Sequence, residues 1–382
     1  RDGNGNVIAL AESAWDPPQD GSDLVLTIDS AVQLIAEQAL DKAIAEQHAS
    51  GGTVIIQNPK TGEILAMASR PTFDPNAFDT VDDPSIFNNP AISETYEPGS
   101  TFKTLVMALG LETGAVTPDT QHNGGLYKVL PGGAKIYNAN AVDFGPETMT
   151  EVLQHSSNLG SMFVAEQIGE DNFYRGLLAF GIGQPTGVDL NGESDGILPL
   201  PGDPNWSIAN FYTSAFGQGL AVTPLQLVNA VSALANGGQL MTPRIVCEVR
   251  GTETQHFDPV VQRRVISEQT SREITDMLVT VMNTTYERFR VPGYNIAAKT
   301  GTAQVPSPDG GYESDATIGS MIGYGPAEDP QFTVLVKIDR PQESQWGEQA
   351  AGPAFQEIFQ RLFLLYGIPP SDPAAQSQPE QP

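Results

Sequence analysis

The spacing of apolar residues predicts a helix close to the start of the chain. Apolar side chains recur every three or four positions over residues 31–48. Asp29 or Ser30 stands directly before this run, where a side-chain oxygen can cap the first helical amides. The β-rich run 24–28 comes just before, so the pattern predicts a short strand followed by a helix.

The next pattern predicts a β-hairpin. Residues 53–57 and 63–69 are both rich in residues that favour strands. The intervening segment 58–62 reads Asn-Pro-Lys-Thr-Gly, and its Asn, Pro and Gly are turn formers. The two runs are therefore expected to pair as neighbouring antiparallel strands.

The middle of the chain, residues 85–290, has mostly helical periodicity interrupted by loops rich in Gly and Pro. Its clearest helical runs are residues 101–112, 150–168 and 224–235. Strand-like runs return at 294–304, 316–324 and 332–338, and a helix is predicted at 353–365. The simplest arrangement is an α/β (α+β) fold. In it, one central antiparallel sheet is assembled from distant parts of the chain and flanked by helices, and a mostly helical subdomain is inserted.

Both ends of the chain differ from this pattern. Residues 1–22 are polar and rich in Gly, Asn, Asp and Pro, which predicts a linker or the end of a lost domain. Residues 368–382 are rich in Pro and Gln, which predicts a disordered tail. One folded domain is expected over residues 23–367.

Composition narrows the function classes. The 382 residues are 40% apolar and carry 19 Lys and Arg against 46 Asp and Glu, a net charge of −27. A field of this sign repels phosphate backbones and anionic lipid, which disfavours binding to nucleic acid or to a membrane surface through general electrostatics, and no nucleic-acid partner is expected. The single cysteine, Cys247, excludes an intrachain disulfide and a cysteine-based metal site.

Several familiar catalytic signals are absent from the sequence. It contains no His-Glu-x-x-His, no phosphate-binding Gly-x-x-x-x-Gly-Lys-Ser/Thr and no Gly-x-Ser-x-Gly. The four histidines, at positions 48, 122, 155 and 256, are too scattered to indicate a metal site. Neither a metal nor a cofactor is expected.

Candidate chemistry begins with Ser100-Thr101-Phe102-Lys103 at the start of a predicted helix. Ser100 and Lys103 are three residues apart and share a helical face, so the amine can approach the hydroxyl. A lysine whose pKa is lowered by burial or by nearby positive charge can serve as the base that a serine nucleophile needs.

Two further motifs strengthen this candidate. Ser156-Ser157-Asn158 places two hydroxyls and an amide in a tight cluster. Lys299-Thr300-Gly301-Thr302 falls on a predicted strand, where a cation, hydroxyls and a close backbone approach suit an extended substrate that bears a carboxylate. A second Lys-Thr-Gly at Lys60 lies in the predicted hairpin turn and is assigned to structure.

Ser-x-x-Lys, Ser-x-Asn and Lys-Thr-Gly in this order resemble the penicillin-recognising serine acyltransferases. The flanking sequences are more specific and resemble the transpeptidase domain of class B penicillin-binding proteins over about residues 23–367. The run before it, residues 1–22, resembles the end of the family's membrane-proximal pedestal domain, whose body is missing from this chain. The flanking sequences are Gly52–Ser69, Tyr96–Lys103, Ser156–Gly160, Phe216–Gly219, Thr223–Gln226 and Ala298–Gln304.

The resemblance implies a role for each motif residue. Ser100 is the nucleophile that attacks the penultimate D-Ala of a peptidoglycan stem peptide, Lys103 its base, and Ser156 the relay that returns the proton to the leaving amine. Substrate-binding residues are implied at Asn158, Lys299, Thr300, Gly301 and Thr302. The backbone N–H groups of Ser100 and Thr302 are implied to form the oxyanion hole.

The same resemblance implies the cellular setting. It implies that β-lactams are covalent inhibitors and that the protein takes part in cell-wall synthesis at the extracytoplasmic face of a bacterial membrane. An N-terminal helix that is absent from this chain is implied to anchor the protein there. A membrane glycosyltransferase and proteins of a division or elongation complex are the implied partners. The run from Tyr294 to Gln304 and the segment 323–330 favour septal over side-wall synthesis.

Two alternatives stay open at this point. A serine β-lactamase or D,D-carboxypeptidase would use the same three motifs but hydrolyse the acyl-enzyme. The sequence lacks the Glu-x-x-Leu-Asn run that the commonest β-lactamases carry after the position of Ser156. A noncatalytic β-lactam-binding scaffold is the other alternative, and the three intact motifs disfavour it.

Overall fold

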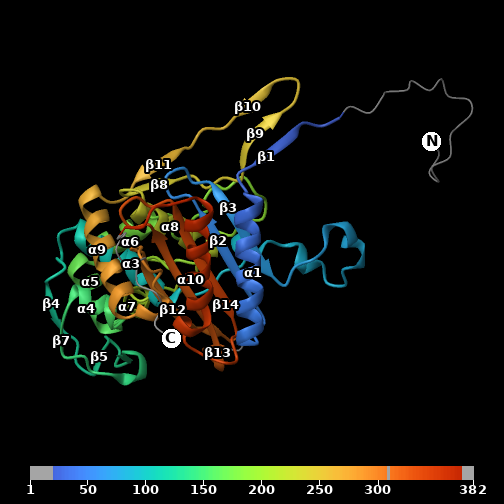
Figure 1. Ribbon diagram of the computed structural model, residues 1–382. Coiled ribbons are helices and arrows are strands. Elements are labelled where there is room, and N and C mark those ends of the chain that lie inside the picture. The colour runs from blue at the N-terminus through green and yellow to red at the C-terminus, as the bar shows by residue number, and fades with distance from the viewer. Residues whose placement is uncertain (1–19, 308–309, 372–382) are drawn as a thin grey trace, which may run out of the picture.

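Five antiparallel strands from distant parts of the chain form the central sheet (Figure 1). The computed structural model describes residues 20–307 and 310–371. The strand order is β12, β13, β14, β2, β3, with ranges Ala297–Pro306, Tyr312–Gly325, Phe332–Asp339, Gly51–Gln57 and Ile64–Arg70. In the register, Leu335 of β14 pairs with Ile322 on one side and Ile55 on the other. The predicted sheet is confirmed, including the hairpin of β2 and β3.

Helices cover both faces of this sheet (Figure 1). On one face α1 (Ser30–Gln47) and α10 (Gly347–Leu365) pack against each other and against the strands, and α8 (Pro224–Ala235) packs against β2 and β14 from the other. Every residue of β2 is buried as a result, which is why its apolar residues do not alternate with exposed ones. Asp29 caps α1, since its carboxylate accepts from two amides of the first turn at 2.8 and 3.1 Å.

The last helix begins earlier than predicted. The sequence predicts a start at Pro353, whereas α10 begins at Gly347. Gly347 lies so close to β12 that a Cβ atom there would be 1.8 Å from the carbonyl oxygen of Gly301. The first turns of α10 place the small residues Gly347 and Ala350 against the sheet, and such residues give little apolar periodicity from which to predict a helix.

The segment between β3 and β12 is mostly helical, as predicted. Its other longer helices are α3 (Lys103–Glu112), α4 (Met149–Gln154), α5 (Asn158–Ile168), α6 (Glu170–Ala179), α7 (Ile208–Ser214) and α9 (Glu268–Thr284). The prediction of one continuous helix over 150–168 is wrong, because Ser156 has φ of 57° and separates α4 from α5. Each of the two helices has its own cap, Thr148 for α4 and Ser157 for α5.

Short strands in the same part of the chain carry too few residues to show a burial pattern, so the sequence did not predict them. They are β4 (Gln121–Asn123), β5 (Tyr127–Val129), β6 (Lys135–Tyr137), β7 (Pro146–Thr148), β8 (Gln239–Met241), β9 (Val246–Arg250), β10 (Thr254–His256) and β11 (Val261–Arg264). The strand predicted at 24–28 is β1 (Asp23–Leu26), which pairs with β9 rather than with the central sheet.

Single-turn helices complete the fold. They are η1 (Pro75–Thr80), η2 (Pro84–Phe87), α2 (Pro90–Ser93), η3 (Gly99–Phe102), η4 (Ala139–Ala141) and η5 (Glu287–Phe289). Within residues 20–307 and 310–371, no helix has both the length and the hydropathy of a membrane span.

The expected terminal segments fall mostly outside the described residues, which exclude 1–19 and 372–382. The linker predicted at 1–22 and the tail predicted at 368–382 therefore stay predictions over those stretches. Ile368, the first residue of that tail, still contacts the folded domain, since its carbonyl oxygen accepts from Tyr294 Oη at 2.7 Å.

Candidate active site

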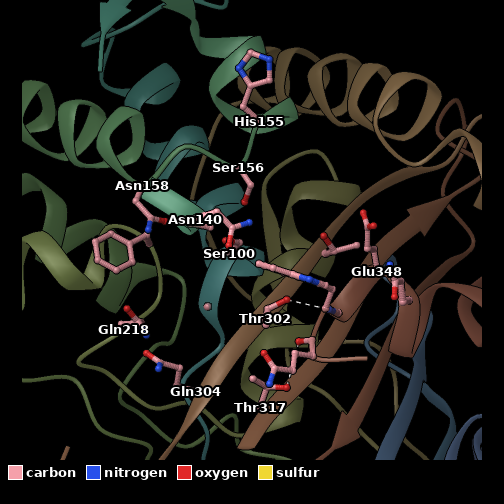
Figure 2. A pocket seen from close by; sticks show the side chains of 18 of the residues that line it. Ser100, Asn140, His155, Ser156, Asn158, Gln218, Thr302, Gln304, Thr317 and Glu348 are labelled. Carbon is pink, nitrogen blue, oxygen red and sulfur yellow. Dashed lines mark hydrogen bonds between the residues drawn. The ribbon is translucent and has the colours of Figure 1, made fainter. Parts of the chain in front are cut away.

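A cavity of about 750 Å³ lies beside the edge strand β12, between η3 and the turn that joins α4 to α5 (Figure 2). Five of the eight residues predicted from the sequence line it: Ser100, Ser156, Asn158, Thr300 and Thr302. The other three, Lys103, Lys299 and Gly301, lie behind its wall, since the two lysines are only 1% and 0% exposed. The fold thus brings all three sequence motifs to one place.

Ser100 stands in η3, directly before α3, and lines the cavity. The chain just before it is held from a distant segment. The Gly99 amide donates to the carbonyl oxygen of Gly217 at 3.0 Å, and the Glu97 carboxylate accepts from the Gly219 amide at 2.8 Å. These contacts fix the backbone of Ser100 before any substrate is present, which favours its use as a nucleophile.

The Lys103 amine lies in the wall behind Ser100. Its Nζ contacts the Ser156 carbonyl oxygen at 2.5 Å, Asn158 Oδ1 at 2.8 Å and Ser156 Oγ at 3.3 Å. Burial, followed by the nearby positive charge of Lys299, holds the pKa of Lys103 well below its usual value, and Glu147 opposes the shift. Lys103 therefore gives up its proton more readily than an ordinary lysine.

Lys103 Nζ has three oxygen partners, which a protonated amine satisfies with three N–H donors. After loss of one proton, the Ser156 carbonyl and Asn158 Oδ1 still accept from the two remaining N–H groups, and the lone pair is left for a hydroxyl proton. In the part of the chain that the structure describes, no hydrogen bond joins Lys103 Nζ to Ser100 Oγ. The direct approach expected from the three-residue spacing therefore stays a prediction.

The turn that carries Ser156 and Asn158 is held by the segment at Tyr137 and Asn138, which lies 20 residues before Asn158. Asn138 Oδ1 accepts from the amide of Asn158 at 2.8 Å and from that of Leu159 at 3.1 Å, so it caps the start of α5. The Asn158 side chain donates to the Tyr137 carbonyl at 3.0 Å. Both ends of that amide are engaged, which fixes its oxygen on Lys103.

On β12, side chains alternate between the cavity and the interior. Thr300 and Thr302 reach the cavity, and Lys299 points the other way. The Lys299 amine donates to Tyr286 Oη at 2.9 Å and to the Thr300 carbonyl at 3.3 Å. Lys299 is 0% exposed and does not line the cavity, so the contact with a carboxylate that the sequence predicts for it stays a prediction.

Gly301 lets η3 pack against β12. A Cβ atom at Gly301 would lie 2.8 Å from the Pro98 carbonyl oxygen and 2.8 Å from Ser320 Oγ. One residue later, Thr302 Oγ1 accepts from the Gly347 amide at 2.8 Å, which links β12 to the start of α10. The backbones of Ser100 and Thr302 therefore belong to elements in direct contact, as a shared oxyanion hole would require.

Sequence reasoning missed several residues of this site. Tyr286 follows α9 in a turn without any motif, and Asn138 lies in a loop. Glu147, whose side chain is 0% exposed, pairs with His155 at the cavity wall, with Oε1 2.9 Å from Nδ1. None of these positions has a spacing pattern, and only the fold places them beside the motifs.

The other sequence candidates do not join the site. Lys60, in the second Lys-Thr-Gly, is in the turn before β3 and pairs with Asp329. The residues described contain no group of three or more His, Cys, Asp or Glu side chains that could hold a metal ion.

Comparison with known proteins agrees with these motifs. Residues 52–360 match the family model described as penicillin binding protein transpeptidase domain. The chain is 40% identical over 379 residues to stage V sporulation protein D of Bacillus subtilis, covering 97% of this chain and 58% of that protein. It is 33% identical to a probable peptidoglycan D,D-transpeptidase, PbpC, of Pseudomonas aeruginosa, covering 93% of this chain and 61% of that protein.

A solved structure shows the same fold. Penicillin-binding protein 3 of Mycobacterium tuberculosis, complexed with aztreonam, superposes with a TM-score of 0.83 at 31% identity, covering 92% of this chain and 81% of that one. The chain spans less than two thirds of the length of the two curated relatives. Over the part that it does span, motifs, fold and family model agree, and the chain belongs to the family of penicillin-binding protein transpeptidase domains.

Proposed function

We propose that this domain is a peptidoglycan D,D-transpeptidase that cross-links stem peptides through an ester on Ser100. The observation that carries the proposal is the buried Lys103 amine, whose lowered pKa and hydrogen bonds suit a base at the start of the helix that follows Ser100. The name of the Pseudomonas aeruginosa relative and the β-lactam in the Mycobacterium tuberculosis structure support the same reaction class.

In the first step, Ser100 Oγ attacks the carbonyl carbon of the penultimate D-Ala, and its proton passes to the Lys103 amine. The bond to the nitrogen of the terminal D-Ala then breaks. That nitrogen receives the proton from Lys103 through Ser156 Oγ, which lies 3.3 Å from Lys103 Nζ. Free D-Ala leaves, and the rest of the stem peptide stays as an ester on Ser100.

In the second step, the amine of a neighbouring stem peptide attacks the ester. Its proton returns by the same groups to Ser100 Oγ as the ester bond breaks, so a new peptide bond forms and the enzyme is restored. A β-lactam acylates Ser100 in the first step, but its leaving group stays tethered to the acyl group, so the enzyme is held as the acyl-enzyme.

Binding and charge stabilisation come from the cavity wall. The N–H groups of Ser100 and Thr302 stabilise the negative charge that develops on the attacked carbonyl oxygen, a contribution of about 3 kcal/mol per donor in comparable sites. Asn158 holds Lys103 and the substrate amide. Thr300 and Thr302, which line the cavity, bind the terminal carboxylate beside the positive charge of Lys299, and Gly301 allows the close approach.

The cellular setting is part of the proposal. The transpeptidase domain spans about residues 23–367 and acts on the extracytoplasmic face of a bacterial membrane. A helix outside this sequence anchors the protein there. The domain works with a membrane glycosyltransferase and a division complex in septal cell-wall synthesis.

Covalent labelling tests the proposal. Fluorescent penicillin should label the protein, and mass mapping should place the label on Ser100. Ser100→Ala should abolish labelling, whereas Ser85→Ala, in the distant η2 turn, should leave it unchanged. A label that persists on Ser100→Ala would remove Ser100 as the nucleophile.

The fate of the labelled enzyme separates transpeptidation from the alternatives. Intact mass followed over time should show an acyl-enzyme that persists for minutes or longer. Loss of the acyl group within seconds would identify a β-lactamase or D,D-carboxypeptidase. A stable acyl-enzyme with β-lactam, but no transfer from a donor peptide to an amine acceptor in the assembled membrane complex, would indicate a noncatalytic scaffold.

A further inference from the structure

We propose that Tyr286 is a further substrate-binding residue, whose phenol donates a hydrogen bond to the C-terminal carboxylate of the donor stem peptide. This inference rests on the proposed function. It adds to that function a residue that lies outside the three motifs and that no spacing pattern predicts.

Tyr286 occupies a position between the buried cation and the cavity. It follows α9 and lines the same cavity as Thr300. Its Oη accepts from Lys299 Nζ at 2.9 Å and from Thr300 Oγ1 at 2.7 Å. Tyr286 as a whole is only 3% exposed, so packing holds its side chain in place.

The donor and acceptor count leaves the phenol proton free. A tyrosine hydroxyl has one hydrogen to donate and oxygen lone pairs that accept. Both contacts of Tyr286 Oη are with groups that donate to it. Among residues 20–307 and 310–371, none accepts the proton of Tyr286, so this proton is available to an acceptor in the cavity.

The charge of Lys299 makes this proton a strong donor. Lys299 is 0% exposed and does not line the cavity, whereas Tyr286 and Thr300 do. A hydroxyl that accepts from a cation is polarised and donates more strongly. Tyr286 therefore carries the effect of the Lys299 charge to a carboxylate bound in the cavity.

The test is acylation of the full chain by benzylpenicillin and by its methyl ester, which lacks the free carboxylate. Tyr286→Phe keeps the ring and removes only Oη. A lost hydrogen bond to a charged group predicts a second-order acylation rate about 10- to 100-fold lower with benzylpenicillin. The loss should appear in the binding constant rather than in the rate constant of acylation, and the ester should react within about twofold of the wild-type rate.

Tyr212→Phe is the matched control, since the Tyr212 hydroxyl donates to Glu166 at 3.0 Å, away from the cavity lining. It should change neither rate. Equal losses of Tyr286→Phe with acid and ester would show a structural role and overturn the inference, and so would an unchanged rate with the acid. Wild-type protein that reacts with neither compound would overturn the proposed function itself, and this inference with it.

Discussion

The Lys103 amine lies 2.8 Å from Asn158 Oδ1, although the two residues are 55 positions apart in the chain. The other end of the Asn158 amide donates to the Tyr137 carbonyl, so the oxygen is fixed on the amine. Asn158 Oδ1 accepts a hydrogen bond from the Lys103 amine, but it carries no negative charge that would favour protonation of that amine. Asn158 can therefore hold the base in place and leave it neutral.

Asn158→Asp tests whether the neutrality of this contact matters. The new carboxylate has nearly the same shape but places a negative charge beside Lys103, which raises the pKa of the amine. Because the neutral amine is the base, the acidic limb of the acylation profile should move to higher pH, with a rate at pH 7 about tenfold lower or more. A pH series of β-lactam acylation measures this. An unmoved limb would mean that Lys103 is not the group that titrates.

Glu147→Gln should have the opposite effect on the same profile. The Glu147 carboxylate is buried and raises the pKa of Lys103 against the larger effects of burial and Lys299. Its removal lowers that pKa further, so the acidic limb should move to lower pH and the plateau rate should stay unchanged. Glu151→Gln is the control, because Glu151 is a nearby carboxylate in the cap of α4 and is not among the charges that shift Lys103. A shift to higher pH in Glu147→Gln would contradict this assignment.

The sequence predicted most of the sheet because burial on both faces leaves long apolar runs, such as β2 and β14. It could not predict the break at Ser156. The residues from 150 to 168 all tolerate a helix, and what separates α4 from α5 is tertiary. Lys103 and Asn138 bind groups of the turn that a continuous helix would occupy with its own hydrogen bonds.

The motif residues of the site were predictable because chemistry fixes their type and order. Their individual contacts were not. Lys299 is a clear candidate from its sequence, but whether it contacts a ligand depends on the side of β12 that faces the cavity and on Tyr286, which comes from another element. Tyr286 and Asn138 belong to no sequence motif. Only the tertiary structure brings them next to Lys299 and Asn158, so the sequence could not predict their contacts.

Gly347→Ala tests the close contact of α10 with β12. A Cβ atom at this position would lie 1.8 Å from the Gly301 carbonyl oxygen, so helix and strand must separate. Overpacking of this kind destabilises a protein by about 1–3 kcal/mol, which thermal or denaturant unfolding can measure. Acylation should also slow, because Thr302 is bonded to the amide of Gly347. Gly21→Ala, where no atom lies within 4 Å of the new methyl group, should leave both unchanged.

Lys299→Met should affect both capture and catalysis. Loss of the positive charge removes the second largest cause that lowers the pKa of Lys103, so the acidic limb of acylation should move to higher pH. The same loss removes the charge behind Tyr286 and Thr300, so benzylpenicillin should react about 100-fold more slowly than with wild type, and its methyl ester should lose less. Lys42→Met removes an equal charge from the pair that Lys42 of α1 forms with Glu357 of α10, where the lysine side chain is exposed, and should change neither property. Equal effects of the two substitutions would show that the net charge of −27, rather than the position of Lys299, governs the reaction with anionic ligands.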